Sequence, residues 1–214
     1  LLISTLILGG MLIPFEAQVQ NRRVAETQKI MAEIKEALIG YAVINKRLPR
    51  PASSSSVGTE KTLPCGSHGA CTGFVPWATL GVRKLDAWGK IINYSVSPGF
   101  TDSSGITLTS NGSKTVYYTS PFAANPLLTN NIPVVIWSSG TKNFGTSDLG
   151  SGTTLPNNST TNVDEVKNAT DAQTFVSRTT TDQTTATGGE FDDLMTWIPT
   201  EIIITRMITA GQLP

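Results

Sequence analysis

The sequence predicts an α+β protein in which a long N-terminal α-helix, with its apolar first half projecting, packs against an antiparallel β-sheet head. Three observations carry this prediction. Residues 1–15 contain no charged side chain, residues 16–45 follow a helical pattern of apolar positions, and the later chain alternates short β-forming segments with Gly, Asn and Pro turns. We therefore divide the chain into an apolar helix at residues 1–25 and a globular head at residues 26–214.

The opening stretch, LLISTLILGGMLIPFEAQVQ, begins with a run that is apolar on every face. A membrane span needs about 20 apolar residues, and this run is shorter. It also lacks the basic start and the small-residue cleavage site of a signal peptide. An exposed apolar rod needs either a bilayer or copies of itself. The residues expected to lie in the membrane and then in an assembly core are Leu1, Leu2, Ile3, Leu6, Ile7, Leu8, Gly9, Gly10, Met11, Leu12, Ile13, Pro14 and Phe15.

Residues 16–45 are expected to continue this rod as one helix, whose amphipathic part, residues 27–47, packs on the head. The helix should end near Leu48, because Pro49 disfavours helical backbone in the residue before it. A continuous helix would be on the order of 65 Å long, whereas a head of this size is only about 35 Å across, so the first half must project. The expected apolar stripe consists of Ile30, Ile34, Ala37, Leu38, Tyr41 and Ile44.

The head is predicted to be a β-sheet that follows a linker-like loop at residues 49–62. Segments rich in β-forming residues alternate with turn sequences. The NGS sequence at residues 111–113 is a good hairpin turn. The expected strands lie at residues 90–96, 106–110, 115–120 and 132–140.

The last third of the chain has a polar part and an apolar part. Residues 146–190 are rich in Thr, Ser, Asn and Gly, so we expect a long surface excursion with weak structure and one short helix near residues 162–170. In the apolar C-terminus, Pro199 suits a first helical position and Gly211 suits a C-terminal cap. A strand through residues 201–205 is the competing interpretation.

The composition argues against nucleic acid as the main partner. The chain has 214 residues, of which 15% are charged, and its formal net charge is zero. Binding to nucleic acid requires a basic excess that neutralises phosphates, so no nucleic-acid partner is expected. Ser, Thr, Asn and Gly are abundant instead of charged residues, as is typical of exported β-rich proteins.

Three local sequences resemble a known family. LILGGMLIPFEAQVQ is similar to the end of a pilin hydrophobic segment, LDAWGKIINYSV to the strand entry of pseudopilin heads, and GFVPWATLG with DDLMTWIPTEIIITRMITAGQLP to bacterial prepilin-like proteins. Together with the long helix, they resemble the type IV pilin and pseudopilin superfamily. The resemblance implies a pilin-like fold and a structural subunit that is not an enzyme and needs no cofactor.

The resemblance also implies a location and partners. The protein would lie in the bacterial inner membrane before assembly, and then in a cell-surface filament or a periplasmic pseudopilus. Its partners would be identical subunits in a helical filament and the pilus or secretion machinery that assembles them. The alternative, from another class, is a membrane-anchored periplasmic binding or adhesion module that remains monomeric.

The sequence departs from the family at the processing site. Precursors of the family carry a Gly followed by an aromatic residue, with a Glu at the fifth mature position, and this motif is absent from the sequence before Pro14. By the spacing to Pro14, about eight further residues are expected before Leu1, which would bring the apolar run to roughly 22 and allow it to span a bilayer. Because Gly9, Gly10 and Pro14 weaken helical backbone, the helix is expected to be kinked or melted between Gly9 and Glu16 in the assembled state.

Cys65, His68 and Cys71 follow one another at three-residue steps, which allows a metal loop or a disulfide. A zinc site needs four ligands, and the chain has no other Cys or His. We therefore prefer a disulfide between Cys65 and Cys71, in keeping with an exported protein. Closing so short a loop would contribute about 2 to 3 kcal/mol.

Glu190, Asp192 and Asp193 form a small acidic cluster. Some pseudopilins hold calcium in a C-terminal loop to which GGEFDDLMTW is loosely similar, so these residues are weak metal candidates. A solvated acidic turn is preferred, because the spaced oxygen ligands of a calcium loop are missing. No catalytic residue is expected, since SSGTKNFG at residues 138–145 lacks the nucleophile-elbow pattern and a His base.

Overall fold

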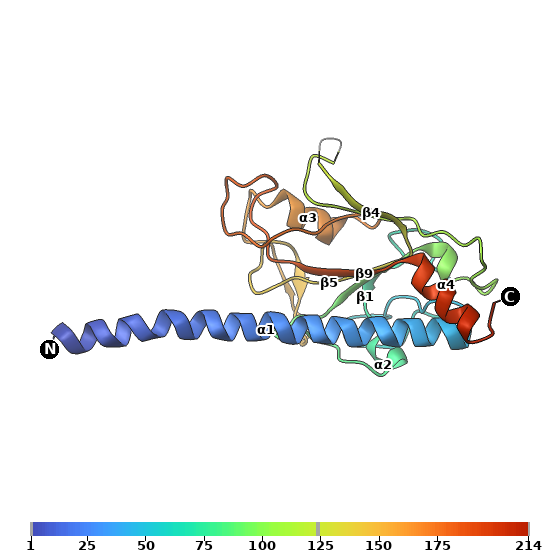
Figure 1. Cartoon of the computed structure of the whole chain (residues 1–214), viewed down its shortest axis with the longest axis horizontal. Coiled ribbons are helices and arrows are strands. Elements are labelled where there is room, and N and C mark those ends of the chain that lie inside the picture. The colour runs from blue at the N-terminus through green and yellow to red at the C-terminus, as the bar shows by residue number, and fades with distance from the viewer. Residues whose placement is uncertain (1, 123–124, 214) are drawn as a thin grey trace.

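The computed structural model describes residues 2–122 and 125–213, with side chains from Glu16 onward in the first helix. Helix α1 (Leu2–Asn45) lies along one side of a head that contains two main β-sheets. Figure 1 shows the N-terminal end of α1 extending well past the head, while its C-terminal half packs against it. The α+β class and the helix-plus-head arrangement are confirmed.

Helix α1 contacts the head through one stripe of residues at three- and four-residue steps. The buried members are Thr27, Ile30, Met31, Ile34, Leu38, Ile39 and Ala42. The predicted stripe is wrong at Ile44, which is 79% exposed. At 100° per residue, Ile44 lies about 120° around the helix from Leu38, so it turns away from the sheet. The helix ends at Asn45 and Leu48 is buried, close to the predicted end.

The sheet that packs on α1 has four antiparallel strands in the order β1-β2-β5-β9: β1 (Thr72–Phe74), β2 (Asn93–Val96), β5 (Val134–Ser138) and β9 (Leu194–Ile198). Side chains alternate between its two faces. Val134 and Ile136 join the α1 core, and Val135 and Trp137 face the other way. Every residue of β5 is buried because both faces of this strand are covered.

A second sheet covers the far face of the first. It has the order β4-β3-β8, with β3 (Lys114–Tyr117), β4 (Leu127–Ile132) and β8 (Thr174–Val176). Val116 and Phe175 pack against Trp137, and the ring centroids of Phe175 and Trp137 are 5.3 Å apart. Strands β3 and β8 are parallel, so the expectation of a wholly antiparallel head is wrong in this sheet.

The polar excursion at residues 146–190 is better structured than predicted. It contributes β8, whose Phe175 and Val176 are buried, and helix α3 (Val163–Thr170), which confirms the predicted short helix. A two-stranded pair is formed by β6 (Ser147–Asp148) and β7 (Thr154–Leu155). Two apolar residues in a polar stretch are enough to anchor β8, because they complete a core that the other strands supply.

The strand predicted at residues 106–110 is wrong, and so is the hairpin at residues 111–113. Residues 106–110 form a turn in which the Ser110 amide donates to the Thr107 carbonyl at 3.1 Å. The Thr107 amide donates to the Ser110 hydroxyl at 2.9 Å, and such local side-chain bonds compete with strand pairing. Strand β3 pairs with β4 instead.

The C-terminus forms helix α4 (Thr200–Thr209), so the helical interpretation is confirmed and the competing strand is wrong. Pro199 caps the helix rather than occupying its first turn. Gly211 has a φ of +69°, and the Gln212 amide donates to the Met207 carbonyl at 2.8 Å, as in a glycine C-cap. Ile203 and Met207 are buried in the core that α1 also lines. Two shorter elements are α2 (Trp77–Leu80) and the 3-10 helix η1 (Pro98–Phe100).

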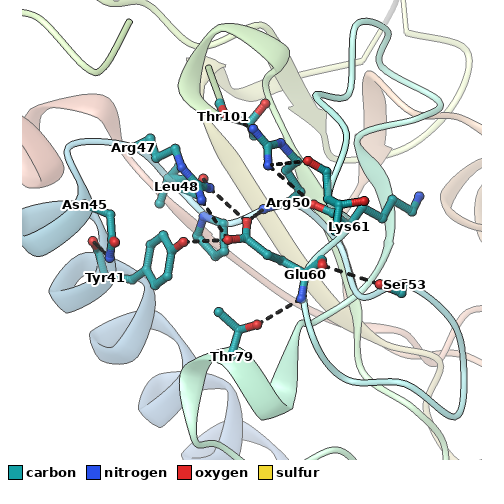
Figure 2. A network of polar contacts seen from close by, with 12 residues as sticks. Tyr41, Asn45, Arg47, Leu48, Arg50, Ser53, Glu60, Lys61, Thr79 and Thr101 are labelled. Atoms are coloured by element: carbon teal, nitrogen blue, oxygen red, sulfur yellow. Dashed lines mark hydrogen bonds and ion pairs between the residues drawn. The ribbon is translucent and has the colours of Figure 1, made fainter. Parts of the chain in front are cut away.

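The loop at residues 49–62 is packed against α1, and the prediction of a linker is wrong. Figure 2 shows Glu60 held between the end of α1 and the chain that follows it. Its carboxylate accepts hydrogen bonds from the Tyr41 hydroxyl at 2.7 Å, from the Arg47 guanidinium at 2.7 and 2.8 Å, and from the Arg50 amide at 2.9 Å. The Glu60 amide donates to the Thr79 hydroxyl. One carboxylate therefore ties the loop to the end of the helix.

Candidate functional site

The first candidate site is the N-terminal part of α1. The helix has 44 residues, a length of about 66 Å at 1.5 Å per residue. Glu16, Ala17 and Gln18 are exposed, and from Glu16 onward the first hydrogen bond to the head runs from the Trp88 indole to the Gln20 side chain at 3.1 Å. The helix therefore leaves the head near Gln20, and Figure 1 shows its N-terminal end projecting beyond the head.

The expected assembly residues, Leu1 to Phe15, lie outside the residues whose side chains the structure describes. The backbone of α1 is one helix from Leu2 to Asn45 in this single chain. The kink between Gly9 and Glu16 is expected in the assembled state, and it stays a prediction. Among the residues with described side chains, no helix combines the length and the apolar character of a membrane span.

The sequence LDAWGK forms a turn that docks the head on α1. The Asp86 carboxylate accepts from the Trp88 and Lys90 amides at 2.9 Å each, and from the Ser138 hydroxyl at 2.6 Å. The neighbouring Ala87 amide donates to the buried Thr27 hydroxyl of α1 at 3.2 Å. Asp86 thus shapes the turn that contacts α1 at Thr27, C-terminal to the exposed residues Glu16 to Gln18.

Cys65 and Cys71 are bonded to each other, with Cα atoms 5.1 Å apart, as preferred from the sequence. Both residues are buried. A metal loop at Cys65, His68 and Cys71 is therefore ruled out in this state. The His68 ring lies 3.5 Å from the ammonium of buried Lys114. Burial and the charge of Lys114 both lower the pKa of His68.

A second candidate site is a buried cluster of carboxyl groups where α3 meets β9. Oxygens of Glu165, Asp192 and Asp193 lie within 4.8 Å of one another. Glu165 Oε1 accepts from the Asp192 amide and from the Asp193 amide, the latter at 3.1 Å. Asn168 donates to Asp193 Oδ2 at 2.7 Å. Asp192 Oδ2 accepts from the Lys142 amide at 2.6 Å, and Asp192 Oδ1 has no hydrogen-bond partner among the described residues.

The structure brings together only part of the acidic cluster expected from the sequence. Glu190, Asp192 and Asp193 are 6%, 7% and 5% exposed, so the expectation of a solvated turn is wrong for all three. Glu190 lies apart and accepts bonds from the Ser159 hydroxyl at 2.9 Å and from the Thr161 hydroxyl at 2.5 Å. Glu165 was missed because it is distant in sequence. The signal available in the sequence was the spacing of polar residues along the predicted helix: Asp164, Glu165 and Asn168 share one helix face. In the structure all three are buried.

The electrostatics of the cluster favour bound protons. Burial, followed by the charge of Asp193, raises the pKa of Glu165. Burial and the charge of Glu165 raise the pKa of Asp192 to about 7. Burial also raises the pKa of Asp193, against the hydrogen bonds from Glu165 and Asn168. The nearby Lys90 ammonium donates to the Ser139 carbonyl at 2.9 Å and to the Lys142 carbonyl at 2.5 Å.

Three carboxyl groups can hold a cation, but this set fits a shared proton better. Calcium takes six to eight oxygen ligands. Oxygens of Glu165 and Asp193 are already engaged by backbone amides and by the Asn168 amide. A proton between Glu165 and Asp193 needs no further ligand and removes one buried charge. The cluster therefore serves to join α3 to the start of β9.

The fold and these sites define an α+β protein with a projecting N-terminal helix and a polar, disulfide-bonded head. Comparisons of the chain with protein-family models, with curated proteins and with solved structures find no match.

Proposed function

We propose that this chain is a structural subunit of a type IV pilus-like or type II secretion pseudopilus filament, and that it assembles through its N-terminal apolar helix. The observation that supports this proposal is the projection of α1 from the head. The exposed residues Glu16, Ala17 and Gln18 lead directly into fifteen residues without a charge.

The physical argument rests on where an apolar helix can be stable. Burial of an apolar side chain contributes about 1.5 to 3 kcal/mol, so covering residues 1–15 amounts at most to a few tens of kcal/mol. Lipid provides this cover before assembly, and neighbouring copies of the helix provide it afterwards. The gain between these two states is small because both are apolar, so assembly needs a machine that extracts the subunit from the membrane.

The proposed assembly is a helical homopolymer with the apolar helices in its core and the heads outside. A contact between two different surfaces of the same chain does not close on itself, and it propagates as a helix. A net charge of zero keeps the repulsion between stacked heads small. We propose no catalytic role and no cofactor for this subunit.

The test is a single charge in the apolar helix. Leu6→Asp should abolish fibres in cells that produce the full chain, because a charge in the core of a filament lacks a partner. Gln28→Asp is the matched control, since Gln28 is exposed on the part of α1 that lies beside the head, and it should assemble normally. A head that begins at about Ala25 should remain a folded, soluble monomer. Normal fibres from Leu6→Asp would contradict the proposal and favour a membrane-anchored monomer.

A further inference from the structure

Helices α1 and α4 form an exposed apolar groove at the end of the molecule opposite to the free N-terminus (Figure 1). The groove has a volume of about 530 Å³. Its floor and walls are formed by Ile39, Gly40, Val43, Ile44, Thr209 and Ala210. Ile44 is 79% exposed there, in the last turn of α1. Glu36 and Arg206 stand at the rim with charged atoms 3.9 Å apart. The other six lining residues carry no charge.

Gly40 lies in this groove without an explanation inside the chain. A Cβ atom built on Gly40 would meet no atom within 4 Å. The residue lies in the helix interior, where glycine is less favourable than alanine. Nothing in the described head therefore needs a glycine at this position. A glycine in a helix face does allow the backbone of a second helix to approach closely.

We propose that this groove receives the apolar N-terminal segment, residues 1–15, of a second copy of the chain. The inference rests on the proposed function and deepens it by naming the surface that the projecting helix meets. The segment carries no charge, which matches the uncharged floor of the groove. It also contains the pair Gly9 and Gly10, which would lower the steric barrier opposite Gly40.

The occupant has to come from another copy. Phe15 and Gly40 lie on the same continuous helix, and the 25 residues between them correspond to about 37 Å. A chain cannot fold its own N-terminal segment back onto its own groove without breaking α1. The contact joins residues 1–15 of one copy to the groove between α1 and α4 of the next. Such a head-to-tail contact does not close on itself and can repeat along a filament.

The first test compares leucine at two exposed glycines in the full chain. Gly40→Leu fills the groove and should remove fibres, without lowering the melting temperature of the head. Gly99→Leu is the matched control, because Gly99 is also exposed, with open space around its Cβ position and no positive φ, and it should keep normal fibres. Normal fibres from Gly40→Leu overturn the groove inference alone. Absence of fibres from the wild-type chain overturns this inference together with the proposed function.

The second test detects the contact directly and decides the matter even if Gly40→Leu destabilises the head. Both native cysteines are disulfide-bonded, so cysteines can be introduced in pairs. Fibres that carry Gly40→Cys with Gly9→Cys or Gly10→Cys should give a ladder of cross-linked oligomers under mild oxidation. Fibres with the same N-terminal cysteine and Gly99→Cys should give none. Intact fibres that yield no ladder with either Gly40→Cys pair, or equal ladders with Gly99→Cys, overturn the inference.

Discussion

At the level of single residues, the Glu60 carboxylate ties the loop at residues 49–62 to the end of α1 through its hydrogen bonds with Tyr41, Arg47 and the Arg50 amide. Burial alone would raise the pKa of its carboxyl, but the hydrogen bonds from Arg47, from the Arg50 amide and from Tyr41 outweigh burial and lower the pKa to about 2. A carboxyl with a lowered folded-state pKa stabilises the protein above its unfolded value of 4.5, and this contribution is lost as the pH falls toward 2.

We expect Glu60→Gln to lower the free energy of unfolding at pH 7 by about 1 to 3 kcal/mol, because it removes a charged hydrogen-bond acceptor beside Arg47. The variant should also lose less stability than the wild type between pH 4.5 and pH 2. Urea denaturation across this range measures both effects. Glu33→Gln, on the exposed face of α1, is the control and should behave like the wild type. Parallel stability curves for Glu60→Gln and the wild type would contradict the prediction.

Glu165 is expected to have the opposite effect on the pH dependence of stability. Its pKa is raised by burial and by Asp193, so the folded chain holds a proton that the unfolded chain releases above about pH 4.5. Stability should therefore fall as the pH rises, with a slope of up to about 1.4 kcal/mol per pH unit for one proton. Gln has the shape of a protonated Glu, so Glu165→Gln should flatten this slope.

Urea denaturation between pH 5 and pH 9 would measure the effect of Glu165→Gln. The control is Glu201→Gln, because Glu201 is exposed on α4. A wild-type curve with no downward slope would exclude a retained proton. If calcium raised the unfolding midpoint of the wild type but not of Glu165→Gln, the cluster would be a cation site instead.

At the scale of elements, the N-terminal part of α1 should change conformation on assembly. Pro14 lacks an amide hydrogen and Gly9 and Gly10 weaken the helix by about 1 kcal/mol each. Once neighbours surround the segment, their contacts can offset the lost hydrogen bonds. We expect a filament map at side-chain resolution to show a kinked or melted backbone between Gly9 and Glu16. Unbroken helical hydrogen bonding from Ile13 to Ala17 would show that the single-chain conformation is kept.

Elements with a strong local pattern could be predicted from the sequence, and elements that depend on distant partners could not. The buried strand β5 and helices α3 and α4 follow from composition and capping residues close to them. Strand β8 has only three residues and exists because β3 lies beside it. Residues 106–110 have β-forming side chains but no partner strand, so the same pattern yields a turn.

The candidate sites show the same limit. The disulfide was predictable because two cysteines six positions apart were the only ones in the chain. Glu165 was not predictable as a neighbour of Asp193, because the contact joins α3 to β9 across 28 positions. Glu60 looked like part of a polar linker, and its role depends on the distant Tyr41 and Arg47 of the α1 end.

At the level of the whole molecule, one continuous helix, α1, carries the apolar segment of residues 1–15 at one end and the polar head at the other. The rod lacks a polar face, and the head ends in an apolar groove between α1 and α4. If these two ends bind one another between copies, as we propose, the contact repeats in one direction.

Filament formation can be examined by electron microscopy of material sheared from the surface of cells that produce this chain, with mass spectrometry of the fibres. We expect thin helical fibres in which this chain is a component, with the heads outside. If the full-length wild-type chain is instead found only as membrane-bound monomers, the filament account is wrong.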